Sequence, residues 1–338
     1  MSMEMNLSVG AKKRNLRRIA VLTSGGDAPG MNAAIRAVVR TALAEGIDVI
    51  AIRRGYAGLL AGEIHVVDRR EVGGIIQRGG TILGTARSAE FATKEGQLLA
   101  LANLQKFGVE GLVVIGGDGS LHGALELHRL GFPVVGVPAT IDNDLSGTEM
   151  AIGVDTALNT ALEAIDRIKD TASAHNRAFV VEVMGRNSGY LALMAGLAAG
   201  AEIVLIPEVD TSLETVLQEL QAAYQAGKPH FIVVVAEGAR FKGPEVAEYI
   251  ARAKVDEGFE SRLTVLGHVQ RGGSPSAFDR ILSTRLGAGA VQALRDGLTG
   301  QMVGLQAGRI RTVPLEEVLD HRRQLDMEVF RLANILAR

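Results

Sequence analysis

Two glycine-rich turns and one acidic loop contain residues whose types and spacing could carry out chemistry. Residues 25–32 have the sequence GGDAPGMN, residues 116–120 GGDGS and residues 140–144 TIDND. Glycine lets backbone N–H groups approach a phosphate closely, and the amino end of a following helix favours negative charge. The turns match neither the P-loop nor the dinucleotide fingerprint. They therefore indicate either polyphosphate binding of another kind or ordinary strand-to-helix turns.

The acidic residues of these segments suit a metal ion and a general base. Asp118 fits Mg²⁺, which takes one or two carboxylates and otherwise keeps water and phosphate oxygens. Ser120 is expected to cap the helix that follows. Asp142 and Asp144 repel each other, so the pair indicates a metal, a base or an Asx-type turn. An Asp beside a hydroxyl group can accept the proton that leaves when that hydroxyl is phosphorylated.

Arginines without nearby acidic partners in the sequence could bind phosphate groups, because a guanidinium offers two donors in phosphate geometry. Each of them taken alone is more often a surface residue. Glu237 and His268 each end an apolar run, and a His satisfied by a backbone carbonyl is the ordinary alternative to a ligand role. The arginines are Arg87, Arg177, Arg186, Arg262 and Arg271.

Short apolar runs rich in β-branched residues precede these segments and must position them. Strands without in/out alternation, each followed by a helix, predict an α/β fold with mostly parallel, doubly wound sheets. Ligands then bind at the carboxyl ends of the strands. We expect strands at 18–22, 111–115, 178–184, 231–236 and 263–268, and helices at 31–44, 120–130, up to residue 199, and at 315–338.

Composition narrows the class of protein. The formal net charge of −2 gives no electrostatic case for nucleic acid or an anionic membrane as a partner. The absence of Cys excludes disulfides and thiolate chemistry and fits a reducing compartment. No signal-peptide pattern opens the chain, and the longest charge-free apolar stretch falls short of the roughly 20 residues that span a bilayer. A cytoplasmic enzyme is the resulting prediction.

Taken together, the motifs resemble those of bacterial ATP-dependent 6-phosphofructokinases, in the same order and with similar spacing. The resemblance covers roughly residues 19–305 and implies two Rossmann-like domains. It implies a nucleotide-binding domain at 17–152, completed by roughly 269–315, and a sugar-phosphate domain at 153–268, with 316–338 packing back as a C-terminal helix. The motifs are Gly25–Asn32, Gly116–Ser120, Thr140–Asp144, Val183–Arg186 and Gly267–Pro275.

This family transfers the γ-phosphoryl group of Mg-ATP to the 1-hydroxyl of fructose 6-phosphate, giving fructose 1,6-bisphosphate and ADP in the committed step of glycolysis. The resemblance implies that Asp142 is the base, that Asp118 binds Mg²⁺, that Arg87 and Arg186 stabilise the transition state, and that Thr140 orients the transferred group. The implied ATP-binding residues are Gly26, Tyr56, Arg87, Ser88, Gly117, Asp118, Gly119 and Ser120. The implied sugar-phosphate residues are Thr140, Ile141, Asp142, Arg177, Met184, Gly185, Arg186, Glu237, Arg262, His268, Val269, Gln270 and Arg271.

Two further properties follow from the resemblance. Arg177 and Arg262 match positions that reach the substrate of a neighbouring subunit, which implies a homotetramer. An effector site for ADP or phosphoenolpyruvate is implied between subunits, although a solvated basic face is the alternative for Arg36 and Arg40. Lys169 stands where the family commonly has Arg, and Ala226 and Pro229 replace positions that are often basic, so altered regulation is expected. The effector residues are Arg36, Arg40, Arg69, Lys169, Gly200, Ala201, Glu202 and Lys228.

The phosphoryl donor can be inferred from side-chain size. Pyrophosphate-using relatives carry an Asp and a Lys where this chain has Gly119 and Ala139, and those side chains fill the space of an α-phosphate. ATP is therefore the expected donor, with pyrophosphate as the nearest alternative. Another acceptor, such as sedoheptulose 7-phosphate or a nucleoside, and a catalytically silent effector-binding subunit are the remaining alternatives. A dinucleotide oxidoreductase is disfavoured because no GxGxxG motif follows a strand.

Overall fold

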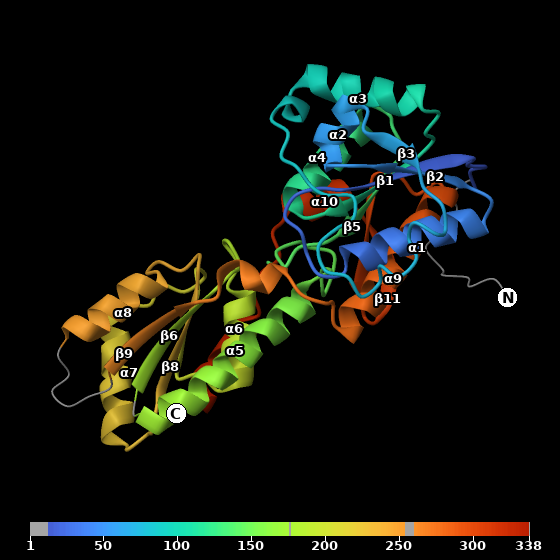
Figure 1. Ribbon diagram of the computed structural model, residues 1–338. Helices are drawn as coiled ribbons and strands as arrows, with labels where there is room; N and C mark the ends of the chain where they lie inside the picture. Colours follow the sequence, from blue (N-terminus) through green and yellow to red (C-terminus); the bar gives the residue numbers. More distant parts are fainter. Residues whose placement is uncertain (1–12, 176, 254–259, 338) are drawn as a thin grey trace. The chain divides into compact units, whose positions relative to one another are not determined.

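The computed structural model describes residues 13–175, 177–253 and 260–337, which divide into two compact units. One unit comprises residues up to Thr140, then Asp144–Asp155 and Arg271–Arg323. The other comprises Ile141–Asn143, Thr156–Gln270 and the residues from Gln324 onward. We refer to them as unit 1 and unit 2. Each is an α/β unit built on its own sheet (Figure 1).

Unit 1 is built on a seven-stranded sheet in the order β11-β10-β5-β4-β1-β2-β3. The five central strands are parallel, and the two edge strands pair antiparallel to their neighbours. Every residue of β4 and β5 is buried, as expected for strands covered on both faces. The strands are β1 (Arg18–Thr23), β2 (Asp48–Ile52), β3 (Ile64–Val66), β4 (Leu112–Gly116), β5 (Val134–Pro138), β10 (Gln301–Gln306) and β11 (Arg309–Pro314).

Helices cover both faces of this sheet (Figure 1). On one side α2, α3, α4 and α10 contribute apolar residues to a single core cluster with the strands. On the other side α1 packs on α9, and Gly287 permits that close approach because a Cβ there would lie 2.7 Å from the Ala34 carbonyl oxygen. The helices are α1 (Met31–Ala44), α2 (Gly55–Ala61), η1 (Glu90–Ala92), α3 (Lys94–Lys106), α4 (Asp118–Arg129), α9 (Ala277–Arg295) and α10 (Leu315–Asp320).

Unit 2 is built on a four-stranded parallel sheet in the order β7-β8-β6-β9. Residues of α5, α6, α7 and α8 enter the apolar core on this sheet, and Phe330 of α11 packs against it. The strands are β6 (Arg177–Val183), β7 (Ile203–Leu205), β8 (Phe231–Ala236) and β9 (Glu260–Val265). The helices are α5 (Val154–His175), α6 (Tyr190–Ala199), α7 (Leu213–Gln225), α8 (Gly243–Arg252), η2 (Gly267–Arg271) and α11 (Met327–Leu336).

The predicted fold class is confirmed, and two predicted elements are wrong. The strand expected to reach His268 ends at Val265, and a 3₁₀ turn begins at Gly267, whose φ of 54° is a conformation suited to glycine. The single helix expected over 315–338 is two helices, α10 and α11. The first belongs to unit 1 and the second to unit 2. None of the helices in the described ranges is long and apolar enough to cross a bilayer.

Candidate active site

In unit 1, three loops meet at the carboxyl ends of the neighbouring strands β5, β4 and β1. Ser120 is buried, and its Oγ lies 3.0 Å from the place where a Cβ on Gly25 would be. A Cβ on Gly117 would lie 3.3 Å from the Thr140 Cβ. The glycine-rich turns and Thr140, the first residue of the TIDND loop, therefore come together at one edge of the sheet, as predicted from the sequence.

The loop at residues 24–30 is held by the segment that precedes η1. Thr23 Oγ1 lies 2.9 Å from Thr81 Oγ1 and donates to the Gly84 carbonyl. The Asn32 side chain donates to the Arg78 and Gly79 carbonyls and accepts the Ile82 N–H. Thr81 had no signal in the sequence, because these hydrogen bonds join residues about 50 positions apart. Gly25 and Gly26 remain exposed above this support.

Asp118 stands at the amino end of α4, with its side chain 46% exposed. His122, one turn later, places its Nδ1 3.5 Å from Asp118 Oδ1. No atom lies within 4 Å of the place where a Cβ on Gly119 would be. An accessible carboxylate beside open space fits a Mg²⁺ ion that takes its other ligands from water and phosphate.

The prediction that Ser120 caps α4 is wrong. The N-cap residue is Gly117, which offers no side-chain cap, and Ser120 lies in the first turn of the helix. Its buried Oγ instead packs between Gly25 and Gly116, where added Cβ atoms would lie 3.0 Å and 2.5 Å away. Both glycines are therefore required by the packing of the two loops.

Tyr56, predicted near the adenosine, is buried in the core of unit 1. Its ring stacks on Phe91 at 3.9 Å between centroids, and its hydroxyl donates to the Ser120 carbonyl at 2.7 Å. Burial raises the pKa of this phenol well above its ordinary value, so the hydroxyl remains a donor. Tyr56 thus supports the start of α4 from below, and contact with the nucleotide stays a prediction.

The predicted transition-state and ATP residues after Gly84 lie at the surface. Arg87 is exposed. Ser88 Oγ accepts the Phe91 N–H at 3.2 Å, from a position two residues before η1. This hydrogen bond helps to position Phe91, on which Tyr56 stacks. The nucleotide contacts assigned to Arg87 and Ser88 stay predictions.

The TIDND loop is anchored before its two acidic residues. Thr140 donates its N–H to the Ile152 carbonyl at 3.1 Å, and Ala139 forms a bridge with Ile152. Ile141 and Asp142 are buried, with Asp142 only 3% exposed. Asn143 adopts φ 49°, a left-handed conformation that Asn tolerates better than most residues. The backbone of this loop is thereby fixed on both sides of Asp142.

In unit 2, one carboxylate organises the loop that carries Arg186. Glu237 Oε1 accepts the Gly185 N–H at 3.1 Å and the Arg186 N–H at 2.7 Å. Arg186 has φ 51°, which costs a non-glycine residue about 1–2 kcal/mol. A Cβ on Gly238 would lie 1.9 Å from the Arg186 carbonyl oxygen. Charge-assisted hydrogen bonds to a carboxylate can hold such a conformation.

Gln270 supports the same loop from η2. It is fully buried, and its Oε1 accepts the Met184 N–H at 2.8 Å. The structure therefore brings Met184, Gly185, Glu237 and Gln270 together, as predicted. The Glu237 and Gln270 side chains accept hydrogen bonds from backbone N–H groups here, whereas the sequence motifs suggested that they contact the sugar phosphate. That contact stays a prediction.

The two arginines expected to serve a neighbouring subunit lie together on strands β6 and β9. Arg177 Nε donates to Glu260 Oε2 at 3.0 Å, and Arg262 Nη2 contacts the same carboxylate. Arg262 and, to a lesser degree, Arg177 hold the pKa of Glu260 below its ordinary value. Val269 is 62% exposed and His268 is exposed beside it. Both arginines thus form a surface pair around one carboxylate.

The predicted effector residues divide between the units. Arg36 and Arg40 share one face of α1, and burial together with the charge of Arg40 lowers the pKa of Arg36. Arg69 is exposed in the loop after β3. Two adjacent guanidinium groups that repel each other form a surface suited to an anion.

In unit 2, Lys169 and Lys228 each contact the segment that runs from the end of α6 to Glu202. Lys169 Nζ donates to the Ala199 carbonyl at 2.5 Å, beside Gly200. Lys228 Nζ lies 3.4 Å from Glu202 Oε1 and donates to the Ala337 carbonyl at 2.7 Å. Ala201 continues the turn with an N–H donated to the Gly196 carbonyl.

His230 joins this group and was missed in the sequence. Burial, and then the charges of Lys169 and Lys228, lower its pKa, while Glu202 opposes them. Its Nδ1 lies 2.9 Å from Ser173 Oγ. A lone His before an apolar run gives no signal in a sequence, because its lysine neighbours come from distant segments.

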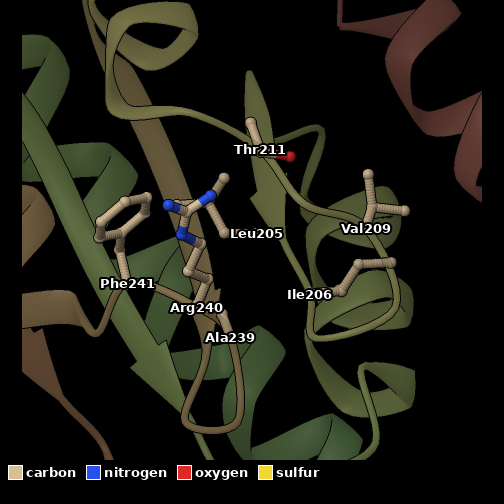
Figure 2. A pocket seen from close by; sticks show the side chains of 7 residues that line it. All are labelled: Leu205, Ile206, Val209, Thr211, Ala239, Arg240 and Phe241. Atoms are coloured by element: carbon tan, nitrogen blue, oxygen red, sulfur yellow. The ribbon is translucent and has the colours of Figure 1, made fainter.

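Unit 2 also contains a pocket whose lining residues are different from those described above (Figure 2). Its lining residues are Leu205, Ile206, Val209, Thr211, Ala239, Arg240 and Phe241. The Arg240 guanidinium lies 5.0 Å from the Phe241 ring centroid and makes two hydrogen bonds to Asp210, at 2.7 Å and 2.8 Å. The arginine is thereby already paired, and none of the predicted site residues lines this pocket.

Comparisons with known proteins agree with this geometry. The ATP-dependent 6-phosphofructokinase 1 of Thermus thermophilus is 56% identical over 95% of this chain and 100% of the relative. The enzyme named ATP-dependent 6-phosphofructokinase of Halalkalibacterium halodurans is 53% identical, with the same coverage.

Solved structures give the same result for the fold. The phosphofructokinase of Saccharomyces cerevisiae is 40% identical, with a TM-score of 0.85 over 90% of this chain and 45% of that chain. The pyrophosphate-dependent phosphofructokinase of Marinobacter aquaeolei shares the fold at 24% identity, with a TM-score of 0.81 over 93% of this chain and 86% of that chain. The family model described as Phosphofructokinase matches residues 18–294. This chain therefore belongs to the phosphofructokinase family.

Proposed function

We propose that this protein transfers the γ-phosphoryl group of Mg-ATP to the 1-hydroxyl of fructose 6-phosphate, giving fructose 1,6-bisphosphate and ADP. Relatives named ATP-dependent 6-phosphofructokinase match it over their whole length at more than half identity. The observation that carries the proposal is the meeting of three loops in unit 1. Those loops combine exposed glycine backbone, the accessible Asp118 carboxylate and Thr140 at the carboxyl ends of parallel strands.

Asp118 is the residue we assign to Mg²⁺. In the described ranges no three His, Cys, Asp or Glu side chains gather as a metal-binding group. That fits an ion that keeps several waters and takes most of its charge compensation from substrate phosphates. When bound, Mg²⁺ offsets the charge on the phosphate oxygens. Gly26 and Gly117 leave their backbone open for the same phosphates.

Asp142 is the group we assign as the proton acceptor. When the sugar 1-hydroxyl attacks phosphorus, the bond from phosphorus to the leaving oxygen of ADP breaks and the hydroxyl proton passes to the Asp142 carboxylate. The fixed backbone on both sides of this buried residue suits a base that must hold one position. Thr140 orients the transferred group, and Arg87 and Arg186 supply positive charge for it.

Met184, Gly185, Arg186, Glu237 and His268 are assigned to the sugar phosphate. The held conformation of the 184–186 loop supports this assignment, because a residue kept at positive φ by two charge-assisted hydrogen bonds indicates a site that must be preorganised. The phosphate of the substrate carries about two negative charges, which the planar guanidinium of Arg186 can meet with two donors.

ATP is the donor that the geometry supports. The position of a Cβ on Gly119 has no atom within 4 Å, and Ala139 carries only a methyl group. Neither residue fills the space that an α-phosphate needs. The relatives named as ATP-dependent are also far more similar in sequence than the pyrophosphate-dependent protein of Marinobacter aquaeolei.

The test is the initial rate with fructose 6-phosphate, comparing Mg-ATP with Mg-pyrophosphate and wild type with Asp142→Asn. Asn keeps the size of the side chain and removes the base, so ATP turnover should fall by about 10²- to 10⁴-fold. Turnover with pyrophosphate alone would replace the donor assignment. A variant as active as the wild type would remove Asp142 from its role.

Regulation and assembly are further parts of this proposal. We assign an anionic effector, ADP or phosphoenolpyruvate, to the basic groups around Arg36 and Lys228, and a homotetramer in which Arg177 and Arg262 serve a neighbouring subunit. Rates that stay flat across added ADP and phosphoenolpyruvate would contradict the effector site. Sedimentation of the active enzyme as a monomer would contradict the assembly.

A further inference from the structure

The loop that follows η2 is fastened to the support of the phosphate loop, all within unit 1. Ser274 Oγ donates to the Gln77 carbonyl at 2.7 Å, and Arg280 Nη2 donates to Ser274 Oγ at 3.0 Å. A Cβ on Gly79 would lie 2.2 Å from the Gly273 carbonyl oxygen, so the backbones of the two segments also approach closely. The loop therefore has a fixed place beside the turn at Gly26.

Arg271, the first residue of this loop in unit 1, extends its guanidinium over Gly26. If Gly26 carried a Cβ, it would lie 2.5 Å from Arg271 Nη1, 3.1 Å from Cζ and 3.5 Å from Nη2. Nη1 also donates to the Asp27 carbonyl at 3.3 Å. The absence of a side chain at position 26 is what allows the guanidinium to lie against the backbone of the phosphate loop.

The charge of this guanidinium is not balanced by a carboxylate. Arg271 takes part in none of the ion pairs between described residues. Its hydrogen bond goes to a backbone carbonyl and leaves the other guanidinium N–H groups for further acceptors. A cation held against a turn that exposes glycine N–H groups is a phosphate-binding arrangement.

We propose that Arg271 donates to the terminal phosphoryl group of the bound nucleoside triphosphate, in addition to the contact with the sugar phosphate implied by its motif. The inference rests on the proposed function, which assigns the backbone at Gly26 to the phosphates of ATP. Arg271 then touches the group that is transferred. Its cation offsets charge on the phosphoryl oxygens before any sugar is present.

The experiment measures nucleotide binding without any sugar phosphate. Arg271→Met and Arg271→Lys are compared with wild type by calorimetric titration with Mg-β,γ-imido-ATP and with Mg-ADP. Arg285→Met is the matched control, because Arg285 is an exposed arginine of the same unit whose Nη2 donates to the Gly308 carbonyl. Circular dichroism and thermal unfolding establish that each variant is folded.

Arg271→Met should weaken imido-ATP binding by about 10- to 100-fold, the usual range for a lost charge-assisted hydrogen bond. ADP lacks the terminal phosphoryl, so its binding should stay within about twofold. Arg271→Lys should recover part of the loss, since it keeps the charge without the planar fork. Arg285→Met should match the wild type with both nucleotides.

Three results would overturn the inference. Unchanged imido-ATP binding together with a raised KM for fructose 6-phosphate would assign Arg271 to the sugar phosphate alone. Equal losses with ADP and imido-ATP would make it a support of the loop, and tighter imido-ATP binding would make it an obstacle to the nucleotide. Failure of the proposed function would appear differently, as a wild-type protein that does not turn over fructose 6-phosphate with ATP.

Discussion

Substitution of Gly119 by Asp separates stability from activity at the nucleotide site. Gly119 lies in the first turn of α4, its φ is not positive, and no atom lies within 4 Å of the place for a Cβ. The Asp side chain therefore enters open space without displacing a neighbour. Relative to Ala in a helix, Gly costs about 1 kcal/mol and Asp about 0.7 kcal/mol, so the exchange gains about 0.3 kcal/mol, and a carboxylate in the first turn adds about 0.3–1 kcal/mol more. The variant should be more stable than the wild type by about 1 kcal/mol.

The same carboxylate should oppose the nucleotide. One negative charge about 5 Å from a phosphate charge costs about 3 kcal/mol at an effective dielectric constant of about 20. Since about 1.4 kcal/mol corresponds to a tenfold change, kcat/KM for ATP should fall by roughly 100-fold or more. The steric argument adds to this value, because the side chain fills space beside the phosphate loops.

The assay pairs urea unfolding with initial rates over a range of Mg-ATP concentrations, for Gly119→Asp and for Gly119→Asn. Asn has almost the same size and no charge, so the difference between the two variants isolates the electrostatic contribution. An Asp variant that is stable and poorly active, with Asn between it and the wild type, agrees with the reasoning. Unchanged kcat/KM for ATP in the Asp variant would refute it.

Two further predictions concern unit 2. Glu237→Gln keeps an oxygen that can accept the Gly185 and Arg186 N–H groups, so KM for fructose 6-phosphate should rise less than about fivefold. Glu237→Ala removes that acceptor and should raise KM more than about tenfold. An equal rise of KM in the two variants would show that the charge of Glu237 contacts the substrate directly. The pKa of His230 is lower in the folded protein than in the unfolded chain, where it is near 6.5. The folded state is therefore not penalised by His230 above about pH 6.5, and it loses stability as the pH falls from there through the folded pKa. Urea unfolding at pH 7.5 and 5.5 should therefore show a larger loss on acidification for wild type than for His230→Asn, and equal losses would contradict the assignment.

The sequence was sufficient for the strands and loops whose signals are local. Strand β8 and helix α1 begin and end where the apolar runs predict, because burial on both faces demands continuous apolar sequence. The meeting of the Gly25, Gly117 and Thr140 loops followed from the rule that parallel strands place their carboxyl ends at one edge. Motif resemblance, supported by those positions, was enough to indicate the family.

Features that depend on distant partners were not predictable. Ser120 has the composition of a cap, yet packing against Gly25 and Gly116 determines its role. The resemblance places Tyr56 near the adenosine, and nothing local in the sequence shows that Phe91, brought in by a separate segment, stacks on its ring. The break between α10 and α11 has no strong local signal, since the apolar spacing continues across it. The position of the Arg271 guanidinium depends on a rotamer, which sequence does not encode.

The division of the chain into units has a consequence for the order in which the protein can fold during synthesis. The sheet of unit 1 includes β10 and β11, and α1 packs on α9, so this unit is incomplete until residues beyond 314 have been made. The four strands of unit 2 lie between Arg177 and Val265 and are finished earlier. During synthesis the amino-terminal half of unit 1 therefore has the β5 edge and the apolar face of α1 uncovered, and unpaired strand edges and exposed apolar surface are prone to aggregation.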